Sequence, residues 1–166
     1  MITYRLGDSL SQGILKNMQW ELKNVAPDLM EVERRRKIEK YLDKGHGFCV
    51  LKNIECAKVV VGAWRHFDGE RYDLTAFVVM PNHVHVLLKI YDGVELAKMV
   101  KSWKSYSARR INEIIKDAGL KTSAPGSLWQ RGYWDRYIRD EKHFYQTIEY
   151  IRENFDSGGI LEYEKE

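Results

Sequence analysis

Apolar and polar residues follow two different periods along the chain, and these periods predict a mixture of strands and helices. Residues 2–6, 71–80 and 83–90 are rich in apolar and β-branched residues and are typical of strands, the last two forming a hairpin around Pro81-Asn82. Apolar residues recur at helical spacing over residues 28–47, 54–67, 94–119 and 140–155. Regular βαβ alternation is missing, so the pattern favours an α+β fold with a mainly antiparallel sheet.

Capping residues support these helix limits. Asn53 and Asp140 stand where side chains accept hydrogen bonds from the first turn of a helix, and Gly119 stands where a helix ends. Gly158 and Gly159 are expected to end the last helix. Between the two C-terminal helices we expect a loop over residues 121–127 and an extended segment over residues 128–139.

The length and hydrophobic content of the chain suit one domain. The chain has 166 residues, of which 44% are hydrophobic, enough for a single core. We expect one domain over residues 1–157 and a short acidic tail over residues 158–166. The apolar runs are too short for a signal peptide or a membrane span. Cys49 and Cys56 lack metal-ligand spacing and are interpreted as reduced, buried thiols, so a cytoplasmic location is expected.

Charge placement says more than the net charge of +3. Residues 98–121 carry seven lysines and arginines against two acidic residues, whereas six acidic residues stand against two basic ones from Glu149 onward. One part of the molecule could therefore face a polyanion that the other would repel.

Two histidines interrupt the most apolar strand. His83 and His85 are two residues apart, so on a strand they share one face, from which both imidazoles can reach one metal ion. Burying two unpaired imidazoles is costly, and a metal would remove that cost. Hydrogen-bonded structural histidines are the other interpretation, and the pair alone does not choose between them.

The last helix offers a nucleophile and an oxygen ligand. Tyr150 and Asn154 are four residues apart and lie together at the edge of its apolar stripe. An Asn oxygen can complete a two-histidine site for a divalent ion, and a tyrosine can attack as a covalent nucleophile. Gln146, one turn earlier, could be the third ligand instead, and a tyrosine at a helix–sheet boundary can also be purely structural.

The stretch AFVVMPNHVHVLL (residues 76–88) closely resembles the HUH signature, histidine–bulky apolar residue–histidine, of single-tyrosine HUH transposases. KSWKSYSARRIN, LWQRGYWDRYIRDEKHF and YIRENF follow in the order seen in that family, and ITYRLGDSL and YLDKGHGFCVLKN resemble its N-terminal part. The resemblance spans nearly the whole chain and points to the REP-associated tyrosine transposase branch.

This resemblance implies a ferredoxin-like α+β sandwich, with helices packed on a central antiparallel sheet that carries the HUH strand. It implies His83, His85 and Asn154 as ligands of Mg²⁺ or Mn²⁺, Tyr150 as the nucleophile, and Lys104 as a DNA contact. The implied activity is cleavage and rejoining of single-stranded DNA through a 5′-phosphotyrosine, often next to a hairpin. Related enzymes can be dimers, so a homodimer is open.

The expected DNA contacts follow the basic helix and the aromatic segment after it. Basic side chains can track phosphates, and aromatic rings can stack on unpaired bases. The candidates are Lys98, Lys101, Lys104, Arg109, Arg131, Trp134 and Arg136. For each lysine, an ordinary solvated helix face is the competing interpretation. The basic run at residues 33–37 is assigned instead to pairing with Glu31 and Glu39.

Two other functions remain open. A DNA-hairpin-binding protein on the same fold would not cleave, but binding alone needs no tyrosine nucleophile. A metal-dependent hydrolase unrelated to DNA would use the histidines but not the basic helix. Salt-dependent oligonucleotide binding would separate the hydrolase from both DNA functions.

Overall fold

The strands form one antiparallel sheet in the computed structural model, which describes residues 1–120 and 127–165. Its order is β4-β1-β3-β2-β5. The strands are β1 (Ile2–Arg5), β2 (Tyr72–Val79), β3 (His83–Ile90), β4 (Trp134–Asp135) and β5 (Leu161–Glu164). The order β4-β1-β3-β2, with helices in the connections from β1 to β2 and from β3 to β4, is that of a ferredoxin-like fold.

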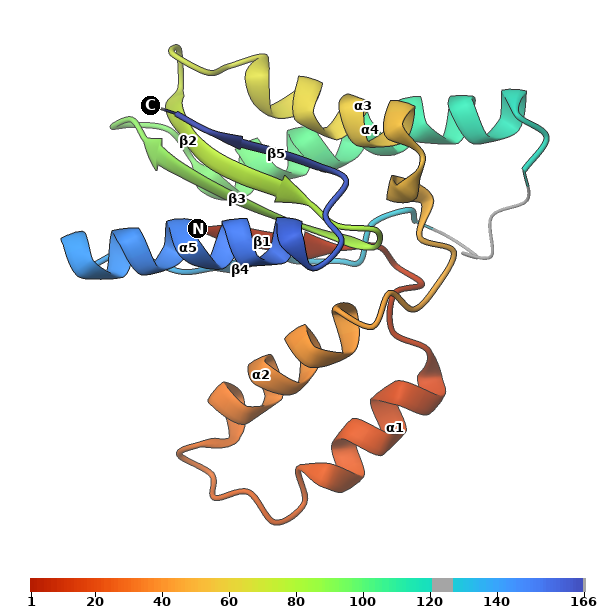
Figure 1. Cartoon of the computed structure of the whole chain (residues 1–166), viewed down its shortest axis with the longest axis vertical. Coiled ribbons are helices and arrows are strands. Elements are labelled where there is room, and N and C mark those ends of the chain that lie inside the picture. Colours follow the sequence, from red (N-terminus) through yellow and green to blue (C-terminus); the bar gives the residue numbers. More distant parts are fainter. Residues whose placement is uncertain (121–126, 166) are drawn as a thin grey trace.

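Helices cover both faces of this sheet (Figure 1). The helices α3 (Ile54–Arg65) and α4 (Leu96–Asp117) pack on one face, and α5 (Glu141–Asp156) packs on the other. Two further helices, α1 (Gln12–Glu21) and α2 (Met30–Leu42), form a hairpin that projects from the sheet on the side of α5, and a short 3₁₀ turn, η1 (Val50–Lys52), precedes α3.

Strand alternation divides the apolar core. Tyr4, Val84 and Val86 point toward α3 and α4 and join the larger core, with Trp64 and Trp103 at its centre. The opposite face carries Ala76, Val78, Met80 and Leu87, which pack against Ile148 and Ile151 of α5. The α1–α2 hairpin has a small core of its own, made by Leu10, Met18, Leu22, Ile38 and Leu42. The histidines of β3 lie on the α5 face, because they alternate with Val84 and Val86.

The α+β class, the β2–β3 hairpin and the four predicted helices are confirmed. Asn53 caps α3 by accepting from Glu55 N, and Asp140 caps α5 by accepting from His143 N. The helix α5 ends where predicted, with Gly158 at a φ of 125°. No helix of the described residues has both the length and the apolar character that a membrane crossing requires.

The pattern missed two elements. The helix α1 has Ser11 as its N-cap but a mostly exposed, polar surface, so its apolar period is weak. Residues 161–164, predicted within an acidic tail over residues 158–166, instead pair with β2 as the strand β5. Leu161 and Tyr163 pack on the larger core and alternate with the exposed Glu162 and Glu164, a strand pattern that covers only four residues of a charged segment. Residues 128–139 form only the two-residue β4, and the loop predicted over residues 121–127 lies outside the described residues except for Ser127.

We expect Gly159→Ala to lower the free energy of unfolding by about 1–3 kcal/mol, the range for overpacking. An added Cβ would lie 2.7 Å from Phe155 Cα and 2.9 Å from Val78 Cγ2, and would push α5 and β5 off the sheet. Urea denaturation measures the change. The control is Gly62→Ala in α3, where a Cβ meets nothing within 4 Å and should stabilise the helix slightly. Equal stabilities of the two variants would contradict the steric argument.

Candidate active site

The two histidines of β3 are buried side by side. His83 and His85 are each 1% exposed, and their ring centroids lie 4.9 Å apart. The alternation of β3 sends both rings to the α5 face, while Val84 and Val86 between and beyond them fill the larger core. The valines on the opposite face of β3 thus fix the strand that carries the two imidazoles.

The neighbouring strands extend this face into a row. Thr3 of β1 is the register partner of His85, and Trp134 of β4 is the register partner of Thr3. Arg5 of β1 is the register partner of His83. Because directly opposite residues share a face of the sheet, Trp134, Thr3 and Arg5 lie on the same side as the histidines.

Each imidazole is held by a hydrogen bond at Nδ1. Thr3 Oγ1 lies 2.8 Å from Nδ1 of His85, and Asn82 Oδ1 lies 2.8 Å from Nδ1 of His83. Asn82 is itself fully buried and donates to the carbonyl of His46. When Nδ1 carries the ring proton, Nε2 of each ring keeps a free lone pair.

Thr3 and Asn82 were not selected from the sequence. Asn82 directly precedes the histidine pair, and Thr3 is a polar residue in an otherwise apolar part of its strand. Both are weak signals alone, because the partner strand that brings Thr3 to His85 cannot be known before the sheet order is known.

The helix α5 places Tyr150 against the histidine pair. The Tyr150 hydroxyl lies 3.4 Å from Nε2 of His85, and the two ring centroids are 5.1 Å apart. Asn154, one turn later, is 8% exposed and donates from Nδ2 to the Tyr150 carbonyl at 2.7 Å. The structure therefore brings together His83, His85, Tyr150 and Asn154, which are the residues selected from the sequence.

Burial sets the protonation of this cluster. It lowers the pKa of His83 to about 3 and lowers that of His85 well below the ordinary histidine value, with His83 and Arg136 adding to the effect. Burial also raises the pKa of Tyr150, and the Glu39 carboxylate raises it further, whereas the Asn154 side chain acts in the opposite direction. At neutral pH the imidazoles are therefore neutral and the phenol is protonated.

The donor set fits a divalent metal ion. Neutral imidazoles whose Nδ1 atoms are hydrogen-bonded present Nε2 as a ligand, the arrangement found around protein-bound metals. Within the described residues no cluster of three or more His, Cys, Asp or Glu is placed to hold an ion. Further ligands would therefore be amide oxygens, water or substrate. Asn154 is buried beside Tyr150, whereas Gln146 is exposed and lines a hollow next to Tyr150.

A hollow of about 810 Å³ opens beside Tyr150. Arg136, Arg139, His143 and Gln146 line it together with the phenol. Of the predicted DNA contacts, Trp134 lies on the histidine face and the exposed Arg136 lies at this hollow. Arg131 is also exposed and near the β1–β4 edge.

The basic helix α4 lies elsewhere. Because α4 packs on the opposite face of the sheet, Lys98, Lys101 and Arg109 are exposed on the side away from Tyr150 (Figure 1). Lys98 also pairs with Glu95 at 2.8 Å. Their contact with DNA stays a prediction, but DNA bound at Tyr150 would have to pass around the sheet edge to reach them.

Lys104 has a structural role in addition to its predicted one. Its ammonium donates to the carbonyls of Gln130 at 2.6 Å and Gly132 at 2.7 Å, and burial lowers its pKa. These bonds fasten α4 to the segment that leads into β4. Lys104 therefore positions Trp134 through the backbone, whatever contact it makes with DNA.

Comparisons with known proteins identify a family for most of the chain. The family model described as "Transposase IS200 like" matches residues 59–154, more than half of the chain. An uncharacterized Haemophilus influenzae protein is 32% identical over 92 residues, which cover 47% of this chain and 51% of that protein. A second protein of that organism, provisionally named a REP-associated tyrosine transposase, is 22% identical over 98 residues, covering 57% and 56%. The chain thus spans about half the length of these curated relatives.

Two solved structures are similar at 17% identity. One is a REP-associated tyrosine transposase bound to a REP hairpin, with a TM-score of 0.48 over 96% of this chain and 67% of that chain. The other is a Deinococcus radiodurans protein provisionally described as a transposase, with a TM-score of 0.41 over 92% and 87%.

Thr3→Val should lower the free energy of unfolding by about 1–3 kcal/mol, because it leaves the buried Nδ1 of His85 without a partner. Thermal or urea denaturation in the presence of a chelator measures this. Thr75→Val on β2 is the matched control, since within the described residues the Thr75 side chain makes no hydrogen bond and is only partly buried. If both variants unfold like the unaltered protein, the Thr3–His85 bond contributes nothing.

Proposed function

The chain belongs to the family of IS200-like transposases, and on this premise we propose that it cuts and rejoins single-stranded DNA through a 5′-phosphotyrosine formed on Tyr150. The observation that carries the proposal is the 3.4 Å approach of the Tyr150 hydroxyl to Nε2 of His85. It joins a helix and a strand far apart in the sequence, and it puts a nucleophile beside a metal-type donor pair.

In the proposed reaction the Tyr150 oxygen attacks the phosphorus of a DNA phosphodiester. The bond from phosphorus to the 3′ oxygen breaks, a proton goes to that oxygen, and a 3′-hydroxyl leaves. The phosphate stays on Tyr150, joined to the 5′ end of the other fragment. Attack by another 3′-hydroxyl reverses the step and rejoins the strands, so no nucleoside triphosphate is needed.

His83 and His85 would hold a divalent ion through Nε2, with Asn154 or Gln146 supplying an amide oxygen. When bound, such an ion neutralises negative charge on a phosphate oxygen. Mg²⁺ and Mn²⁺ are the proposed ions. Thr3 and Asn82 would fix the ring orientation and tautomer, a contribution worth tenfold or more in affinity at comparable sites.

The surroundings of Tyr150 have two consequences for this chemistry. Its raised pKa keeps the phenol protonated at neutral pH, so the proton must leave as the attack proceeds rather than beforehand. The phosphotyrosine would otherwise be consumed by hydrolysis, so the bound DNA strand would have to fill the hollow beside Tyr150 and exclude water from it.

The proposed substrate is an unpaired DNA strand next to a hairpin. The hairpin part rests on the resemblance of nearly the whole chain to the REP-associated branch and on the relative that bears that name. A DNA-hairpin-binding protein that does not cleave is the alternative, and the presence of Tyr150 beside the histidine pair is the feature that such a protein would not need.

Tyr150→Phe should abolish a covalent protein–DNA adduct, because it removes the attacking oxygen. Labelled single strands carrying different hairpins are incubated with Mn²⁺ or Mg²⁺ and resolved on a denaturing gel. Tyr145→Phe is the matched control on the same helix, since Tyr145 is 62% exposed and points away from the core. An adduct that survives in Tyr150→Phe would refute the nucleophile. Tight, salt-sensitive binding by the unaltered protein without any adduct would favour the non-cleaving alternative.

We expect His83→Gln and His85→Gln each to weaken Mn²⁺ binding by roughly tenfold or more, because each removes one imidazole ligand. Calorimetric titration of the chelator-treated protein measures the affinity. His143→Gln serves as the control, because His143 lies two turns before Tyr150 and its Nδ1 instead lies 3.4 Å from the Arg139 amide. Equal affinities in all three variants would place the ion elsewhere.

A further inference from the structure

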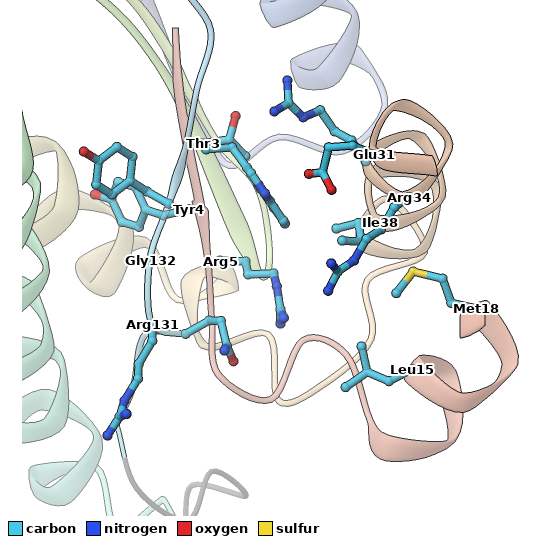
Figure 2. Close-up of a pocket in the computed structure, with 14 residues that line it drawn as sticks. Thr3, Tyr4, Arg5, Leu15, Met18, Glu31, Arg34, Ile38, Arg131 and Gly132 are labelled. Atoms are coloured by element: carbon cyan, nitrogen blue, oxygen red, sulfur yellow. The ribbon is translucent and has the colours of Figure 1, made fainter. Parts of the chain in front are cut away.

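A cleft of about 260 Å³ separates the α1–α2 hairpin from the β1–β4 edge of the sheet (Figure 2). Four arginines line it, with Glu31 as the carboxylate among the lining residues. Figure 2 shows the guanidinium groups of Arg5 and Arg34 directed into the space between β1 and α2, whereas the Arg131 side chain points away from them. The cleft is smaller than the roughly 300–1,000 Å³ of pockets for drug-sized ligands, so it suits one small unit of a longer ligand.

The basic run of α2 divides into two pairs. Arg36 pairs with Glu33, and Lys37 pairs with Glu21 at 2.6 Å, so these two are neutralised. Arg34 and Arg35 face the cleft, and among the described residues neither forms a salt bridge, nor does Arg5. No salt bridge of the predicted kind joins Arg34 or Arg35 to Glu31 or Glu39 within the described residues, although the positive charge of Arg35 acts to lower the pKa of Glu39.

Arg5 and Arg35 are partly dehydrated, whereas Arg34 is exposed. Arg35 Nε is buried and has no hydrogen-bond partner within the described residues. Arg5 donates to Ser9 Oγ at 2.9 Å, which fixes its direction, and burial lowers its pKa. Like charges gathered and dehydrated in this way are costly unless an anion compensates them. Guanidinium groups also match the geometry of a phosphate, to which they donate two parallel hydrogen bonds.

The cleft is linked to the candidate active site through hollows that share lining residues. Arg5 is the register partner of His83, on the same face of the sheet. Arg35 also lines a second hollow, of about 630 Å³, and Arg136 and Arg139 line both that hollow and the one that contains Tyr150. Acidic and basic residues both line the 630 Å³ hollow and the hollow that contains Tyr150. The excess of positive charge is therefore concentrated at the cleft between β1 and α2. A connected track with a basic end fits a chain of phosphates better than a single free anion.

An aromatic side chain also lines the cleft. Trp134 lines the cleft, is partly exposed, and packs on the small core of the α1–α2 hairpin. Its indole N–H forms no hydrogen bond within the part of the chain that the structure describes. A ring held in this way offers a face on which an unpaired base can stack, a contact worth about 1–3 kcal/mol.

We infer that the cleft binds a phosphate of the unpaired DNA strand that runs to Tyr150, held by Arg5, Arg34 and Arg35, with Trp134 beneath an adjacent base. The inference rests on the proposed function, since it takes the strand that Tyr150 cuts as the ligand. It gives the α1–α2 hairpin a role: together with the sheet it clamps the strand at a distance from the cut.

The test compares Arg34→Gln/Arg35→Gln with Lys37→Gln, a control on the same helix whose charge is paired with Glu21 and which lines none of the three hollows. The probe is a fluorescein-labelled single-stranded oligonucleotide of random sequence, and anisotropy gives the dissociation constant of the full chain over a range of salt concentrations. We expect the double variant to bind at least tenfold more weakly. Its salt dependence should also fall by about 0.7 in log–log slope for each phosphate that the variant no longer binds. Lys37→Gln should bind like the unaltered protein.

Two results would overturn the inference. They are an unchanged affinity and slope in the double variant, and an equal weakening in Lys37→Gln. Arg34→Lys keeps the charge but removes the bidentate geometry, and an affinity between those of the unaltered protein and the double variant supports a guanidinium–phosphate contact. Circular dichroism shows that each variant is folded.

The covalent-adduct gel keeps this result separate from the proposed function. If binding depends on Arg34 but the unaltered protein forms no adduct, cleavage would be refuted and DNA binding in the cleft would be supported. If the unaltered protein forms an adduct and the double variant binds DNA as tightly as the unaltered protein, cleavage would be supported and DNA binding in the cleft would be refuted.

Discussion

The burial of two neutral imidazoles on one face of β3 is the constraint on which the rest of the site depends. A buried ring nitrogen without a partner is costly, and here Thr3 and Asn82 satisfy one nitrogen of each ring. That requirement ties β1 to β3 in a fixed register and places the opposite nitrogens toward α5. The apolar residues that alternate with the histidines anchor the strand from the other side, so the same strand serves both the core and the site.

Local pattern was enough to predict the elements that carry strong periodicity. The β2–β3 hairpin, the caps at Asn53 and Asp140, and the pairing of Tyr150 with Asn154 on one helix shoulder all follow from residues close together in the chain. The helix α1 was missed because most of its side chains face water, which leaves little apolar period to detect, and the strand β5 was missed because its alternation covers only four residues of a charged segment. Both are held by tertiary partners, α2 for the helix and β2 for the strand.

The candidate site was predictable in its chemistry but not in its surroundings. The histidine spacing and the tyrosine helix can be recognised in the sequence, whereas Thr3 and Arg5 become site residues only when β1 pairs with β3. The positions of the charged side chains likewise depend on how the elements pack, which the sequence alone does not show. The lysines of α4 are dense in the sequence but lie behind the sheet, while the arginines of α2, which looked self-paired, lie beside the histidine face. Density along a chain does not predict which face of a fold a charge will occupy.

The strand β5 has a consequence for assembly. It occupies the free edge of β2, and its outward side chains include Glu162 and Glu164, the latter paired with Arg152. An exposed strand edge is a template for pairing with another chain, and negative charges on that edge discourage it. A continuous sheet formed across this edge would bring a carboxylate-bearing strand beside a second copy of itself. Pairing of two copies through this edge is therefore disfavoured.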